Sequence, residues 1–182
     1  MTATNARVEL REYDGEADRL VSFLTSQPWP FHGTPNLTEE SVRDSLAKGR
    51  YAGEVTKTFW IQADGTDVGL IRLFDLGDLT PMFDIRIDRN ARGQGIGTAA
   101  LRQATNYLFT AYPDKIRMEG HTRADNYAMR KTFVKAGFVK EGYHRKSWPT
   151  EGVYYDSVGY SILRDDWTSG RTTPVDWNDV PF

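Results

Sequence analysis

Hydrophobic residues alternate with polar residues in several short stretches of the chain, and this period of two predicts β-strands with one buried face. The dipeptide Asp64-Gly65 separates two of these stretches and is typical of a tight hairpin turn. Residues 149–152 separate the last two stretches and predict a second hairpin. The predicted strands cover residues 8–10, 58–63, 68–74, 83–88, 116–122, 138–145 and 153–163.

Apolar residues recur every three or four positions in four other stretches, which predicts amphipathic helices. Thr38 and Asn126 precede two of these helices as N-cap residues, and Gly137 follows the last as a stop signal. Residues 27–35 contain three prolines and cannot form regular structure. The order is strand, two helices, several strands, helix, strand, helix, two strands. It predicts an α/β fold with a mixed sheet and few crossover helices, and not a doubly wound fold.

Composition narrows the classes of protein that remain. The chain has 182 residues and a formal net charge of −2, so no global basic field attracts nucleic acid or an anionic membrane. The absence of cysteine excludes disulfides, thiolate metal sites and a cysteine nucleophile. No apolar run reaches the roughly 20 residues that span a bilayer, and residues 1–16 lack a hydrophobic signal region. We therefore expect a cytoplasmic protein with neither nucleic-acid nor membrane partners.

A glycine-rich segment, Arg92-Gly93-Gln94-Gly95-Ile96-Gly97-Thr98, directly follows a predicted strand and opens a predicted helix. Successive backbone N–H groups in such a turn can point at one anion, and the helix N-terminus adds a favourable partial charge. The segment therefore predicts a diphosphate site, although a tight turn without a ligand is the alternative. Thr98 stands where a dinucleotide fingerprint needs its third glycine, and the Gly-Lys-Ser/Thr of a P-loop is missing.

Two blocks of the sequence resemble the GNAT superfamily of N-acetyltransferases. Residues 92–97 resemble the Gln/Arg-x-x-Gly-x-Gly/Ala motif that holds the coenzyme A pyrophosphate in that family. Residues 126–129 and 136–145 resemble a second block, which is typical of the branch containing the ribosomal-protein alanine acetyltransferases. The landmarks run from Phe83 to Trp167, so we expect an acetyltransferase domain over residues 1–167 and a C-terminal tail over residues 168–182.

The resemblance implies a GNAT fold: a mixed, mostly antiparallel sheet that splays around acetyl-coenzyme A and is flanked by helices. It implies that Ile87 holds the pantetheine arm, that Asn126 lies against the coenzyme, and that Arg130 reaches phosphate or adenine. The alternatives are a plain helix cap for Asn126 and a solvated position for Arg130 and Lys131. The resemblance assigns the diphosphate to Arg92, Gly93, Gln94, Gly95, Ile96, Gly97 and Thr98.

The resemblance also implies direct acetyl transfer to an amine without a metal, which requires the acceptor amine in its neutral form. Asp84 and Glu119 are the candidate general bases, and His121 is a third choice. Each has a plainer interpretation, because Asp84 can pair with Arg86, Glu119 can be solvated, and His121 can be a packed or capping group. Many family members carry a tyrosine that protonates the leaving thiolate at the position of Phe133. Helical spacing from Asn126 predicts that Phe133 approaches the same groove.

The acceptor side is less specific in sequence. Trp29, Phe31 and His32 are candidates for an amine pocket, because aromatic faces attract cations; Trp60 fits a core position better. The acceptor is either a protein N-terminal α-amine or a small-molecule amine, and a homodimer is possible. The alternative from another class is a non-catalytic coenzyme A-binding sensor, which the phenylalanine at position 133 keeps open.

Overall fold

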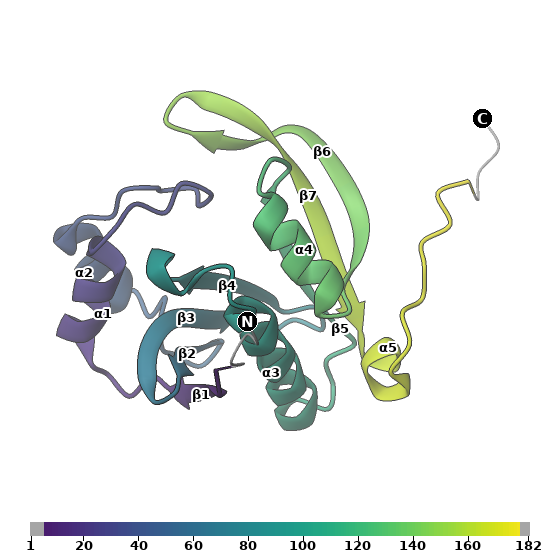
Figure 1. Ribbon diagram of the computed structural model, residues 1–182, viewed down its shortest axis with the longest axis horizontal. Helices are drawn as coiled ribbons and strands as arrows, with labels where there is room; N and C mark the ends of the chain where they lie inside the picture. Colours follow the sequence, from purple (N-terminus) through teal and green to yellow (C-terminus); the bar gives the residue numbers. More distant parts are fainter. Residues whose placement is uncertain (1–5, 179–182) are drawn as a thin grey trace, which may run out of the picture.

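The computed structural model describes residues 6–178 and shows one seven-stranded sheet with helices on both faces (Figure 1). The strand order is β1-β2-β3-β4-β5-β7-β6, and every neighbouring pair is antiparallel except β4 and β5. The α/β class and the mixed, mostly antiparallel sheet predicted from the sequence are confirmed. The strands are β1 (Val8–Glu12), β2 (Thr56–Ala63), β3 (Thr66–Phe74), β4 (Met82–Ile87), β5 (Arg117–Arg123), β6 (Val139–Thr150) and β7 (Val153–Leu163).

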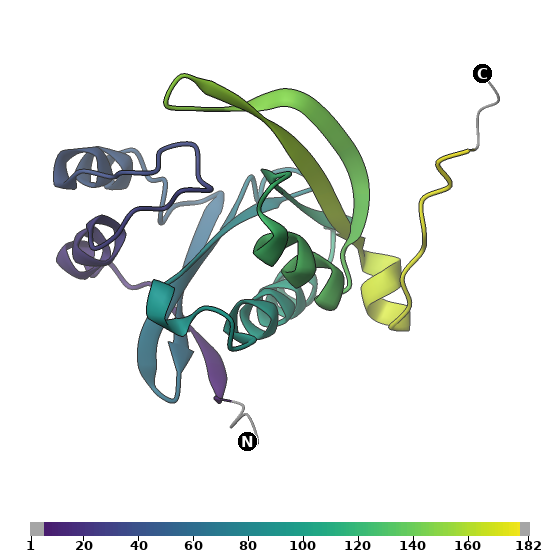
Figure 2. The ribbon, with the colours of Figure 1, turned by 45° about the horizontal axis from the view of Figure 1, so that its top comes forward.

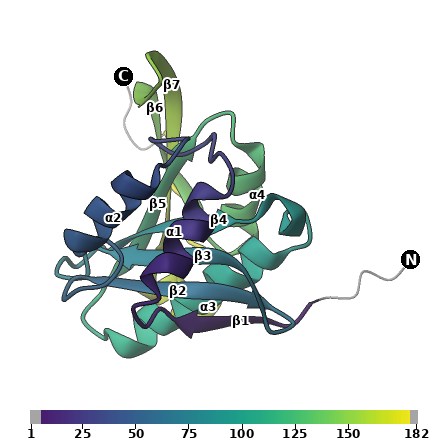
Figure 3. The same cartoon turned by 90° about the vertical axis from the view of Figure 1, so that its left-hand side faces the viewer.

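Helices α3 and α4 cover one face of the sheet, and α1 and α2 cover part of the other (Figures 2 and 3). The α3 side holds the larger core, and the α1 side holds a smaller one around Trp60 and Leu70. The helices are α1 (Ala17–Thr25), α2 (Glu39–Ala47), the 3₁₀ turn η1 (Arg89–Ala91), α3 (Ile96–Ala111), α4 (Tyr127–Lys135) and α5 (Arg164–Ser169). None of these helices is long and apolar enough to cross a membrane.

Local sequence signals account for most of the element ends. Asp64 and Gly65 have φ values of 50° and 81°, as the tight β2–β3 hairpin requires. The Thr38 hydroxyl accepts from the Ser41 N–H at 3.2 Å and so caps α2. Gly137 follows α4 with φ 93°, a left-handed value that glycine adopts without strain.

Helix α5 was not expected, several strands differ by one or two residues, and the largest difference in a strand boundary is at the end of β6. Strand β6 was expected to end at Arg145, but it continues to Thr150 after an irregularity between His144 and Trp148. The turn is therefore only Glu151-Gly152, whose φ values are 48° and 80°. Pro149 can pair with Tyr154 because β6 is the outermost strand, where a missing N–H leaves no ladder bond broken on the free side.

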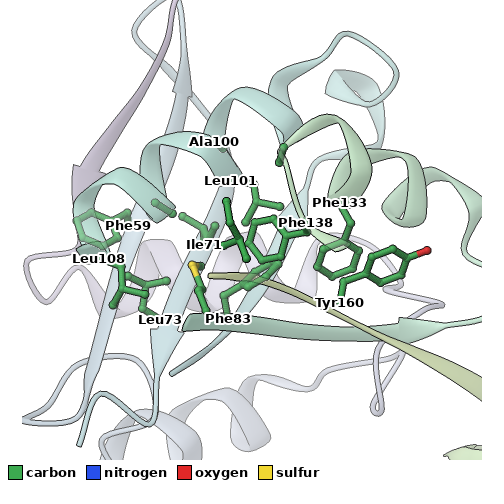
Figure 4. Close-up of a cluster of buried hydrophobic side chains, with 14 of the residues drawn as sticks. Phe59, Ile71, Leu73, Phe83, Ala100, Leu101, Leu108, Phe133, Phe138 and Tyr160 are labelled. Carbon is green, nitrogen blue, oxygen red and sulfur yellow. The ribbon is translucent and has the colours of Figure 1, made fainter. Parts of the chain in front are cut away.

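Strands β4 and β5 separate almost as soon as they meet. Only Met82 and Glu119 pair in register, and the Glu119 N–H donates to the Pro81 carbonyl at 3.0 Å. Beyond that point Phe83 turns its ring across the gap onto Gly120, and Phe133 and Phe138 pack around it (Figure 4). The aromatic cluster therefore fills the gap next to the Met82–Glu119 pair. Farther along β4, at Ile85 and Ile87, the gap stays open.

We predict that Gly120→Ala destabilises the fold by about 1–3 kcal/mol, the usual range for overpacking a core. A β-carbon at Gly120 would lie 2.6 Å from Cε1 of Phe83 and 3.0 Å from Cε1 of Phe133, so buried rings would have to move. Urea unfolding measures the change. Gly33→Ala is the matched control, because its β-carbon would meet no atom within 4 Å. Equal stability of the two variants would contradict this account of the gap.

Candidate active site

A cavity of about 610 Å³ lies where β4 has left β5. Strand β4, the glycine segment, the start of α3, one side of α4 and the 27–35 loop all contribute to its wall. Its lining residues are Trp29, Pro30, Phe31, His32, Ile85, Arg86, Ile87, Ala91, Arg92, Gly93, Gly95, Ile96, Gly97, Thr98, Asn126, Ala128, Met129, Lys131, Thr132 and Lys135.

The glycine segment forms one end of this cavity. Gly93 and Gly95 have φ values of 77° and 82°, and a β-carbon on either would meet only open space. Gly95 is the N-cap of α3 and has no side chain to satisfy the first N–H groups of the helix. The segment is therefore a cradle of free backbone donors at a helix N-terminus, which fits an anionic group.

Positively charged side chains line the same cavity as the cradle. Arg92, Lys131 and Lys135 line the cavity, and the two lysines lie one turn apart on α4. The Arg92 guanidinium donates from Nε to the Ile87 carbonyl at 2.9 Å, so it lies at the end of β4. Lys135 was not a candidate in the sequence; its spacing of four residues from Lys131 is the signal that could have found it.

Most of the residues expected to hold a coenzyme line the cavity, but two do not. The Gln94 side chain donates to the Asn90 carbonyl at 3.0 Å and stays outside. Arg130 donates from Nη1 to the Ala124 carbonyl at 2.8 Å and reaches the Tyr160 hydroxyl at 3.4 Å. Arg130 thus ties α4 to the preceding loop, and the neighbouring Lys131 is the residue that faces the cavity.

Asn126 combines two positions that the sequence left as alternatives. Its side-chain oxygen accepts from the Met129 N–H at 3.2 Å and caps α4. Its amide nitrogen donates to the Thr122 hydroxyl at 2.9 Å. The same residue also lines the cavity, so the cap places it beside any ligand there.

Asp84 belongs to a charged group on the face of β4 opposite Phe83. Its Oδ1 lies 3.0 Å from His32 Nδ1, and its Oδ2 lies 3.3 Å from Arg86 Nε. Burial by itself would raise the pKa of the Asp84 carboxyl, but Arg86, His32 and Arg72 outweigh burial and hold that pKa far below its usual value. Asp84 is therefore ionised at neutral pH and has little affinity for a proton, which weakens the expectation that it is itself the base.

Glu119 and His121 lie together on β5, outside the lining of the cavity. His121 Nε2 is 3.1 Å from a Glu119 oxygen, and Arg117 contacts Glu119 at 3.0 Å and Glu141 at 2.6 Å. The structure thus places the two expected carboxylates in separate groups. Glu119 belongs to a network of charged side chains on β5 and β6. Asp84 contacts His32, and His32 lines the cavity.

The 27–35 loop forms one wall of the cavity and is held in place at several points. The Gln27 side chain bonds Asp88 at 3.3 Å and the Arg89 N–H at 3.1 Å, beyond the end of β4. Arg123 on β5 donates to the Pro30 carbonyl at 3.0 Å. The loop therefore bridges the two separated strands, and it carries all three residues expected to bind the acceptor.

The aromatic residues considered for the acceptor pocket differ in their surroundings. Trp29 is only 1% exposed, donates to the Leu24 carbonyl at 2.8 Å, and packs edge-on against His32. Phe31 lies under the Arg123 guanidinium, 5.1 Å from its ring centre. Trp60 is a core residue of the α1 side and bonds Glu16 at 2.8 Å, as expected for a packing role.

The expectation that Phe133 approaches the groove beside Asn126 is wrong. Phe133 is 1% exposed and is absent from the lining of the cavity. Its ring stacks on Tyr160 with a centroid distance of 4.6 Å and an interplanar angle of 4° (Figure 4). The α4 residues that line the cavity are instead Ala128, Met129, Lys131, Thr132 and Lys135. Phe133 packs in the aromatic core, against Phe83, Phe138 and Tyr160.

Within residues 6–178, no group of three or more His, Asp or Glu side chains is placed so that it could hold a metal ion. The acid–base groups near the cavity are engaged with arginines and with one another.

A splayed mixed sheet with an anion cradle at the start of α3 defines an acetyltransferase class of fold, and the comparisons agree. The sequence model of the acetyltransferase (GNAT) domain matches residues 7–139. The chain therefore belongs to the GNAT family and is an acyltransferase. The family match favours the enzyme over the non-catalytic sensor considered from the sequence.

Individual relatives are similar over most of their length. The Bacillus subtilis protein named "Putative ribosomal N-acetyltransferase YdaF" is 30% identical over 162 residues, which cover 84% of this chain and 88% of that protein. The fold is shared with the spermidine N-acetyltransferase from Vibrio cholerae, solved in complex with CoA and spermine. That structure has a TM-score of 0.74 at 19% identity and matches 88% of this chain and 98% of its own.

We predict that Asp84→Asn lowers stability at neutral pH and that the deficit shrinks in acid. The Asp84 pKa is lower in the folded chain than in the unfolded one. Its contribution is therefore complete above the unfolded pKa near 3.9 and is lost as pH falls below it, by up to about 1.4 kcal/mol per pH unit. Urea unfolding at pH 7 and pH 3 measures the difference between variant and wild type.

Asp44→Asn is the control for this prediction. Asp44 is 56% exposed and pairs with Lys48 on the surface of α2, so its loss should change little at either pH. A deficit for Asp84→Asn that is equal at pH 7 and pH 3 would contradict the ionised state assigned to Asp84.

Proposed function

We propose that the chain transfers the acetyl group of acetyl-coenzyme A directly to an amine. One observation carries the proposal: a single cavity joins the anion cradle of the glycine segment to the unpaired edge of β4. The cradle suits a diphosphate, and the free strand edge suits a linear chain that contains amides. Coenzyme A carries both features in one molecule.

The edge of β4 supplies the support for the arm of the coenzyme. Met82 is the only β4 residue paired with β5, so residues 83–87 have no ladder partner on that side. Backbone N–H and C=O groups away from water need partners, and pantetheine amides can provide them as a strand would. Ile85 and Ile87 line the cavity there. A backbone N–H aimed at the thioester carbonyl would be worth about 2.7–4 kcal/mol.

The positive end of the cavity supports the phosphate assignment. Arg92, Lys131 and Lys135 are cations that line the same cavity as the cradle, and Ile96, Gly97 and Thr98 form the first turn of α3 there. Acetyl-coenzyme A, when bound, supplies the activated acyl group. The chain itself supplies phosphate contacts, orientation along β4 and a route for the acceptor from the side of the 27–35 loop.

The acceptor we propose is a protein N-terminal α-amine or a small-molecule amine. An α-amine with a pKa near 8 costs about 1.4 kcal/mol to neutralise at pH 7, whereas a lysine-like amine costs about 4.6 kcal/mol. The relative named for a ribosomal activity favours the first kind, and the structural neighbour named for spermidine favours the second. A cytoplasmic location, a homodimer and a domain that ends at Trp167 stay predictions.

We predict that Gly97→Glu abolishes stabilisation by acetyl-coenzyme A. A β-carbon at Gly97 would sit 3.8 Å from Ile87 Cγ1 and 3.9 Å from Thr132 Cγ2, so the fold accommodates a side chain. The added carboxylate would then occupy the anion cradle. The shift of the melting temperature with ligand measures this effect. Gly97→Ala tests folding alone, and its melting temperature without ligand should match that of the wild type. An unchanged ligand shift in Gly97→Glu would place the coenzyme elsewhere.

We further predict that the purified protein releases free thiol from acetyl-coenzyme A when an acceptor is present. The panel contains peptides with different N-terminal residues, their N-terminally blocked forms, polyamines and aminoglycosides. Mass spectrometry of the acceptor locates the acetyl group. Activity with free peptides but not with blocked ones identifies the α-amine as the acceptor. Binding of acetyl-coenzyme A without thiol release from any amine would refute the proposed transfer.

A further inference from the structure

We propose that His32 is the general base of the transfer and that Asp84 is its positioning residue. The inference rests on the proposed function and deepens it, because sequence patterns suggested only that His32 binds the acceptor. It is carried by one geometric fact: the imidazole lines the cavity while its Nδ1 is 3.0 Å from the carboxylate of Asp84.

The position of the pair suits this role. Asp84 lies on β4 between Phe83, which closes the gap, and Ile85, which lines the cavity. Side chains alternate along a strand, so Asp84 points to the face opposite the Phe83 core. The 27–35 loop brings His32 to that face, where an acceptor would enter. The pair therefore stands beside the strand edge that would hold the thioester.

The two nitrogens of His32 have different surroundings. Nδ1 lies at hydrogen-bonding distance from Asp84, and within residues 6–178 no hydrogen bond to Nε2 is formed. A carboxylate at Nδ1 favours the tautomer with its proton on Nδ1, which leaves the Nε2 lone pair free to accept a proton. The same carboxylate stabilises the imidazolium that results.

The surroundings of the pair restrict its motion and set its charge. Arg86 on β4 holds the second oxygen of Asp84, and its guanidinium lies 5.3 Å from the Trp29 ring centre. Trp29 in turn packs edge-on against His32, with ring centres 6.2 Å apart. Arg72 on β3 and Tyr51 also face Asp84. Arg86 and Arg72 keep Asp84 ionised, so Asp84 stays a carboxylate beside Nδ1 and does not take up the proton.

The proposed step conserves atoms and charge. The amine nitrogen attacks the thioester carbonyl carbon, a C–N bond forms, and the C–S bond breaks with its electron pair on sulfur. The proton lost by nitrogen moves to His32 Nε2. The imidazolium then returns a proton to the thiolate, which regenerates the neutral base and yields an amide and a free thiol. This route provides an acid for the leaving group, a role that the buried Phe133 cannot fill.

The test compares His32→Gln, Asp84→Asn and Thr34→Ala. General-base help is typically worth 10²–10⁴-fold, so we expect His32→Gln to lower kcat by that factor and to remove the acid limb of the kcat profile. Its Kd for acetyl-coenzyme A should stay within about threefold of wild type. Asp84→Asn should lower kcat less than His32→Gln does and leave that Kd unchanged, because the imidazole remains but loses the carboxylate that positions it. Thr34→Ala, exposed in the same loop, should behave as wild type.

A second measurement does not depend on turnover. Imidazole ¹⁵N shifts at high pH identify the neutral tautomer, and the His32→Gln spectrum assigns the signal among the three histidines. We expect the Nδ1–H form in the wild type and a shift towards Nε2–H in Asp84→Asn, since an amide can donate to Nδ1. An Nε2–H wild type overturns the proposal even if the enzyme is active. Wild-type kcat and an intact acid limb in His32→Gln overturn it while leaving the transfer itself established.

Discussion

The structure depends on the separation of two parallel strands, β4 and β5. A β-strand inside a sheet normally pairs its backbone groups on both sides, but β4 shares only the Met82–Glu119 register with β5. The packing of Phe83 against Gly120 fixes where the separation begins, because no larger residue fits opposite that ring. Everything that lines the cavity is arranged around this opening: the glycine cradle at one end, α4 along one side and the 27–35 loop across the other face.

Charge divides the site into two parts that suit two different substrates. Arg92, Lys131 and Lys135 stand at the cradle, where an anionic donor would lie. Asp84 stands on the opposite face of β4, and Glu119 lies on β5 where the strands diverge. The net charge of the chain is only −2, so the positive charge at this site is local and not a property of the whole surface.

The aromatic core explains why a family motif can keep its position and change its role. A tyrosine at position 133 would need space for a hydroxyl, but the ring of Phe133 is enclosed by Phe83, Phe138 and Tyr160. Phe133 therefore serves the packing that holds β4, α4 and β7 together. The core leaves no hydroxyl at position 133, and the polar residues nearest the cavity lie on the face of β4 that carries Asp84.

The sequence by itself did not predict α5, but it determined most of the strands, helices α1 to α4 and the caps at Thr38 and Asn126, and it indicated the anion cradle, because these follow from the two-residue and 3.6-residue periods and from local turn chemistry. It also determined the family, since short motifs keep their spacing along the chain. Only the tertiary structure decided that Lys131 and Lys135 line the cavity while Arg130 does not, and that Asp84 meets His32. His32 and Asp84 are 52 positions apart, and no local pattern encodes their contact. It arises because Gln27 and Arg123 tie an irregular loop across the gap between two strands.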